Sequence, residues 1–133
     1  MDVTASAQAA ALWVGLHLIL LLVLSVLVVR QRRLHGVVFG DGGAPSLIQA
    51  IRAFGNATEY VPTGLIGLAV LAVAGAPPMV VHVVGVTLFL GRAAHAVGLS
   101  RSGEASLPRS VGVTLTWLAY LAAAVALVFY AIP

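Results

Sequence analysis

The chain has 133 residues, of which 61% are hydrophobic and only 8% are charged, and its net charge is +3. A water-soluble domain of this length needs many more polar residues to cover its surface. The composition therefore excludes a water-soluble domain and indicates a membrane protein. The absence of cysteine excludes disulfides and a protein thiol nucleophile, and the modest positive charge is typical of membrane topology and anionic headgroups rather than of nucleic-acid binding.

Four apolar runs follow one another along the chain. An apolar run of about twenty residues crosses the hydrocarbon at 1.5 Å per residue. The first run is preceded by Asp2 rather than by positive charge and is too long for a signal core, so we expect it to be retained. The sequence therefore predicts an all-α membrane protein, a four-transmembrane-helix bundle with up-down-up-down topology. One domain, residues 1–133, holds spans at about 9–29, 47–75, 79–98 and 110–132.

The arginines predict the orientation of the spans. The second connection and both termini lack arginine, whereas the first and third connections carry Arg30, Arg32, Arg33, Arg101 and Arg109. By the positive-inside rule, the first and third connections face the cytoplasm. Both termini are then expected on the non-cytoplasmic side.

Isolated glycines recur within the spans. Small residues let membrane helices approach closely, so we expect close helix packing at Gly64, Gly67, Gly85 and Gly112. The short second connection, "GAPP", predicts a tight antiparallel hairpin of the second and third spans.

Polar side chains form a stripe where the second span begins. Arg52, Asn56, Glu59 and Tyr60 occupy positions i, i+4, i+7 and i+8 and share one helical face. Folding the second and third spans into a hairpin brings this stripe level with Arg92 and His95, which lie three residues apart on the third span. The spacing predicts a polar layer across at least two helices, about 10 Å inside the cytoplasmic boundary.

Two interpretations of this layer remain open. In the structural one, Arg92 and Glu59 form a buried pair and Asn56 bonds to a neighbouring helix, which fixes the register of the bundle. In the functional one, the excess of arginine over carboxylate attracts an anionic polar ligand, because guanidinium groups bind carboxylates in a bidentate manner. Arg52, Arg92 and Arg109 outnumber Glu59, which favours the functional interpretation.

The segments "GDGGAPSLIQAIRAFGNATEYVP" and "VVHVVGVTLFLGRAAHAVGLS" resemble the family of membrane-associated proteins in eicosanoid and glutathione metabolism (MAPEG), in particular its small bacterial branch. The resemblance covers almost the whole chain. It implies a homotrimer of four-helix bundles in the bacterial inner membrane, with glutathione bound between subunits near the cytoplasmic face. Family members include microsomal glutathione transferases and peroxidases, leukotriene C4 synthase and prostaglandin E synthase.

The resemblance also implies roles for individual residues. Arg109 matches an arginine that stabilises the glutathione thiolate in the family, so Arg109 is the predicted catalytic residue. Leu99 stands where the eicosanoid enzymes have a tyrosine that contacts the ligand. Arg30, or equally Arg32 or Arg33, is expected to reach the ligand of a neighbouring subunit. The residues expected to bind glutathione are Arg52, Asn56, Glu59, Tyr60, Arg92, His95 and Arg30.

The expected activity is glutathione-dependent transfer or peroxide reduction. The glutathione thiol has a pKa of about 8.5, and its thiolate is the nucleophile. A nearby arginine stabilises that thiolate for attack on an apolar electrophile or lipid hydroperoxide. No metal is expected, since the histidines are scattered without carboxylate clusters.

Two other functions remain as alternatives. One is a membrane protein that binds glutathione or a lipid without turnover. The other is a small proton-coupled carrier that uses Glu59 and His95 as a relay, although carriers usually have broken helices that this sequence does not predict.

Overall fold

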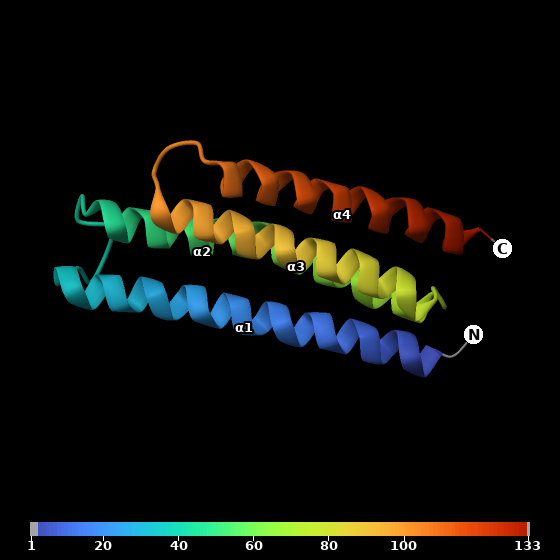
Figure 1. Cartoon of the computed structure of the whole chain (residues 1–133). Coiled ribbons are helices and arrows are strands. Elements are labelled where there is room, and N and C mark those ends of the chain that lie inside the picture. The colour runs from blue at the N-terminus through green and yellow to red at the C-terminus, as the bar shows by residue number, and fades with distance from the viewer. Residues whose placement is uncertain (1–2, 133) are drawn as a thin grey trace.

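The computed structural model describes residues 3–132. It consists of four long helices, α1 (Val3–His35), α2 (Pro45–Val73), α3 (Pro78–Arg101) and α4 (Leu107–Ala131). The helices lie side by side with alternating direction, and the start of α1 and the end of α4 lie at the same end of the bundle (Figure 1). All four are long and apolar enough to cross a membrane. The predicted all-α fold with four spans and up-down-up-down topology is confirmed, and the homotrimer stays a prediction.

The helices extend beyond several of the expected spans. Helix α1 has 33 residues, which corresponds to about 50 Å, whereas the hydrocarbon is about 30 Å thick. It continues through the arginines and ends at His35, and the next residue, Gly36, has φ +64 and terminates the helix. The last turns of α1 therefore lie beyond the apolar run that ends at Val29. Prolines stand in the first turn of α2, α3 and α4, where no backbone donor is lost.

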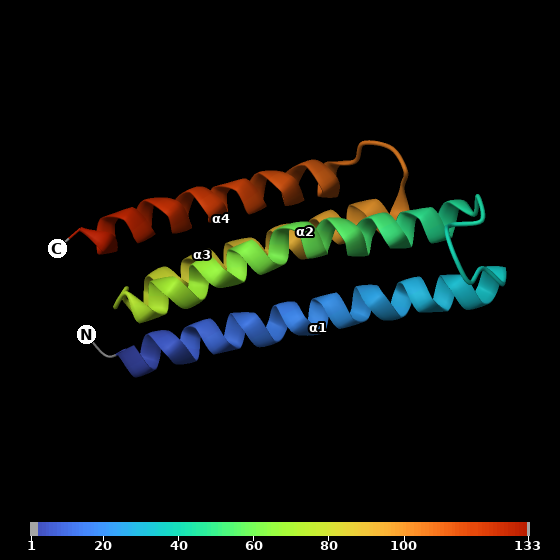
Figure 2. The same ribbon diagram turned by 180° about the vertical axis from the view of Figure 1, so that it is seen from behind.

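Helices α2 and α3 form the middle of the bundle. Helix α3 packs against the other three, α2 also packs against α1 and α4, and within residues 3–132 no contact joins α1 to α4. The view from behind shows the same order, with α1 and α4 on opposite sides (Figure 2). One side of α1 and one side of α4 therefore stay open to lipid or to another protein.

Glycines bring the helices close together, as the sequence predicts. A Cβ atom at Gly85 would overlap the Trp13 ring, one at Gly64 would overlap the Leu88 side chain, and one at Gly112 would overlap the backbone of His95. At Gly67 the nearest atom is 3.9 Å away, an ordinary contact. The contact at Gly112 matters most for the site, because it sets the distance between α3 and α4.

We predict that Gly112→Ala destabilises the protein by about 2 kcal/mol, since the overlapping atoms are backbone and cannot rotate away. Thermal unfolding in detergent measures the effect. Gly55→Ala is the matched control, because no atom lies within 4 Å of the added Cβ atom. Equal stability of the two variants would show that α3 and α4 are not packed this closely.

Candidate functional site

A polar layer centred on Arg92 joins three helices. The Arg92 side chain comes from α3 and is only 1% exposed. Its Nε donates to Oγ1 of Thr116 on α4 at 2.8 Å, and its Nη1 donates to Oδ1 of Asn56 on α2 at 2.8 Å. The guanidinium also lies over the ring of Tyr60, with Cζ 4.8 Å from the ring centroid. Two hydrogen bonds and one cation–π contact thus hold the cation inside the bundle.

Helix α4 contributes two residues that the sequence analysis missed. Thr116 Oγ1 accepts from Arg92 and donates to the carbonyl of Gly112 at 2.8 Å. The Tyr120 hydroxyl donates to the carbonyl of Tyr60, and the centroids of the two tyrosine rings lie 6.1 Å apart. Gly112, Thr116 and Tyr120 follow at intervals of four residues and therefore share one face of α4. This spacing is the signal that could have found them.

The predicted layer across the second and third spans is confirmed by the bond between Asn56 and Arg92. The ion pair of the structural interpretation does not form, because Glu59 is exposed and makes no ion pair within residues 3–132. Arg92 has neutral partners, and its Nη2 is buried without a hydrogen-bond partner. The layer therefore holds a buried cation that no carboxylate of the described chain neutralises.

A second polar feature lies where α3 ends and α4 begins. His95, one turn beyond Arg92, is buried, and it lines a hollow of about 350 Å³ together with Arg109. Arg109 is half-buried, and its Nη1 donates to the carbonyls of Gly103 at 3.4 Å and Glu104 at 3.2 Å. The structure thus brings the predicted catalytic arginine and His95 to one hollow.

Three predicted site residues lie apart from this layer. Arg52 and Glu59 are exposed on α2, and Arg30 is exposed on α1. None of the three side chains makes a hydrogen bond or ion pair within residues 3–132. A single chain therefore assembles Arg92, Asn56 and Tyr60 in one cluster and His95 with Arg109 in another, and leaves these three at its surface. Their assignment to a ligand stays a prediction.

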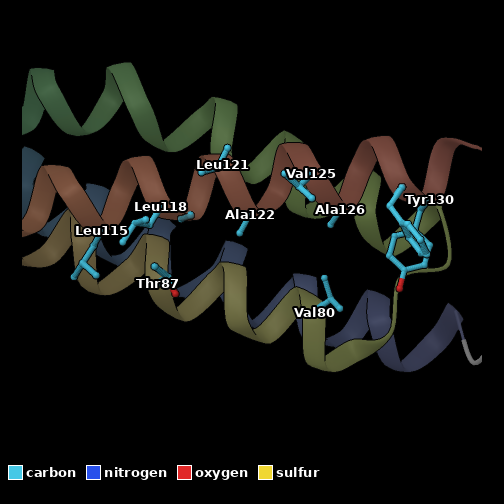
Figure 3. A pocket seen from close by; sticks show the side chains of 11 residues that line it. Val80, Thr87, Leu115, Leu118, Leu121, Ala122, Val125, Ala126 and Tyr130 are labelled. Carbon is cyan, nitrogen blue, oxygen red and sulfur yellow. The ribbon is translucent and has the colours of Figure 1, made fainter.

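Two apolar depressions lie on the side of the polar layer that faces the chain ends. One, of about 300 Å³, lies between α2, α3 and α4 and is lined by Tyr120, Gly64, Gly67 and Leu127 among others. The other, of about 770 Å³, is an open groove between α3 and α4 that runs from Leu115 to Tyr130 (Figure 3). Both have almost entirely apolar linings, which suit hydrocarbon groups rather than polar ligands.

The sequence is similar to a known protein family over most of its length. The model of the MAPEG family matches residues 10–129, a range that includes every predicted site residue. "Inner membrane protein YecN" of Escherichia coli strain K12 is 36% identical over 121 residues, which cover 91% of this chain and 91% of that protein. The protein of the same name from Escherichia coli O6:H1 strain CFT073 matches equally well.

We predict that Thr116→Val costs about 2 kcal/mol of stability, because it leaves the Arg92 Nε buried without an acceptor. Thr87→Val is the matched control, since the Thr87 hydroxyl bonds only to the Val83 carbonyl of its own helix. Unfolding by heat in detergent compares the two. If both variants lose the same amount of thermal stability, the hydrogen bond between Thr116 and Arg92 contributes nothing to stability.

Proposed function

Because the chain belongs to the MAPEG family, we propose that this integral membrane protein is a glutathione-dependent transferase or peroxidase. It activates the glutathione thiol for attack on a hydrophobic electrophile or a lipid hydroperoxide. The alternative is a non-catalytic membrane protein of the same fold that binds glutathione or a lipid. The names of its Escherichia coli relatives state a location and no activity.

The observation that carries the proposal is the unneutralised charge of Arg92. Burying a cation without a counter-charge costs several kcal/mol, even when neutral groups solvate it. Asn56, Thr116 and Tyr60 supply hydrogen bonds and a ring face, but they supply no negative charge. Glutathione carries two carboxylates and would supply it, with Nη2 of Arg92 as the available donor.

Arg109 is the residue proposed to stabilise the thiolate. Its two hydrogen bonds go to backbone carbonyls and are long, so the guanidinium can exchange them for a stronger bond to an anionic sulfur. In the proposed reaction the thiol releases its proton to water. The thiolate then forms a bond to the electrophile, whose leaving group departs with the electron pair. The protein contributes positioning and electrostatic stabilisation.

Surface residues are proposed to complete the site in a homotrimer. Arg52 and Glu59 carry charges suited to the carboxylate and amino ends of the tripeptide, and neither side chain has a partner within residues 3–132. Arg30 is proposed to come from a neighbouring subunit. Tyr60 and His95 would lie between these charged ends and the thiol. The apolar depression beside Tyr120 would receive the hydrophobic substrate from the bilayer.

We place the protein in the bacterial inner membrane, as the names of its relatives state for those proteins. Because arginines gather at the connections between α1 and α2 and between α3 and α4, we propose that the site lies near the cytoplasmic face and the termini on the other side.

The decisive variant is Arg109→Ala. We expect glutathione binding to persist, the ultraviolet absorbance of the bound thiolate to disappear, and turnover of a chromogenic electrophile to fall by about a hundredfold. Arg101→Ala is the control, because Arg101 is exposed at the same end of the bundle. An unchanged thiolate signal removes Arg109 from this role. Wild-type protein that binds glutathione without turnover supports the non-catalytic alternative. Wild-type protein that binds no glutathione contradicts the proposed enzyme and leaves only the lipid-binding form of the alternative.

A further inference from the structure

The connection between α1 and α2 folds back along α1. After Gly36, the amide of Val37 donates to the carbonyl of Arg32 at 3.0 Å. Nη1 of Arg32 then donates to the carbonyls of Val38 at 3.3 Å and Gly40 at 2.9 Å. One guanidinium thus fixes the tip of the connection against the last turns of the helix.

This arrangement brings exposed apolar side chains beside the end of the apolar run of α1. Val38 is 94% exposed and Phe39 is 96% exposed. A hollow of about 290 Å³ is lined by Val29, Arg33 and Val38, so Val38 lies beside the end of the apolar run of α1. Large apolar side chains this exposed mark an interaction surface. If α1 spans the bilayer with its apolar run, the end of that run lies near the acyl boundary, which would cover these side chains.

Arginines stand beside the same surface. A second hollow, of about 500 Å³, lies on the outer side of α1 and is lined by Val26, Val29, Arg30 and Arg33 among others. Arg33 borders both hollows. The guanidinium groups of Arg30 and Arg33 have no hydrogen bond or ion pair within residues 3–132. The surface therefore combines free cations with an aliphatic floor that continues toward the hydrocarbon.

We propose that this surface, formed by Val26, Val29, Arg33, Val38 and Phe39, binds an anionic phospholipid. The phosphate lies on Arg33. An acyl chain follows Val26 and Val29, and the side chains of Val38 and Phe39 insert among the lipids at the interface.

Charge and shape favour a phospholipid over other occupants. Glutathione has no hydrocarbon chain to cover Val26 and Val29. A second copy of the chain would need carboxylates to meet the arginines, and the chain has only four acidic residues. Of these, Asp41 lies in the same connection, whereas Glu59 lies within α2 and Glu104 lies in another connection. A phospholipid supplies both the anion and the acyl chain.

A nitroxide at position 39 tests the depth of the connection. Because the chain has no cysteine, Phe39→Cys gives a single labelling site. Leu18→Cys, which is 57% exposed in mid-span, is the hydrocarbon reference, and Glu104→Cys in the last connection is the water reference. In liposomes containing phosphatidylglycerol, we expect the label at position 39 to be relaxed by oxygen, as at position 18. Preferential relaxation by a water-soluble nickel chelate, or protection from both reagents, overturns the proposal.

Arg33→Gln tests the phosphate site. Phosphatidylglycerol titrated into the detergent-solubilised protein, with binding read by native mass spectrometry, should bind about fivefold more weakly to this variant. Arg33→Lys and Arg101→Gln should bind it as the wild type does, because the first keeps the charge and the second lies elsewhere. Unchanged affinity in Arg33→Gln contradicts the proposal. Arg33 is exposed, so its removal leaves the core intact, and glutathione binding is not needed for either measurement.

Discussion

The rest of the structure depends on one buried guanidinium. Charged groups inside a membrane bundle are costly and persist only with partners. Arg92 obtains its partners from two neighbouring helices, Asn56 and Tyr60 on α2 and Thr116 on α4. Thr116 can reach it only because α3 and α4 lie close together. At Gly91, an added Cβ atom would lie 2.9 Å from the backbone nitrogen of Thr116, so glycine is required there.

The same interaction connects stability with binding. The neutral partners of Arg92 solvate the cation without cancelling its charge, and Nη2 remains without an acceptor. A polar layer of this kind is not needed for stability alone, because apolar residues that replace a buried ionic group together with its partners are often neutral or stabilising. The buried cation therefore supports the anionic ligand that we propose. An anion that reaches the layer would both bind and stabilise the folded protein.

Much of this arrangement could be predicted from the sequence. Length and composition predict the helices, and the short connection before α3 aligns Asn56 with Arg92. The outward position of Glu59 was not predicted. Glu59 follows Asn56 by three residues, so the two side chains point about 60° apart around α2. This rotation is enough to bring Glu59 to the surface. Thr116 and Tyr120 were missed because uncharged hydroxyl groups in an apolar helix give little signal, and because no short connection fixes the rotation of α4.

The central claim is that glutathione neutralises the buried cation, and an experimental structure of the protein with glutathione tests it most directly. The account predicts a carboxylate of the tripeptide within hydrogen-bonding distance of Arg92 Nη2 and the sulfur beside Arg109. A structure in which bound glutathione contacts neither arginine, or in which saturating glutathione leaves the site empty, would contradict it.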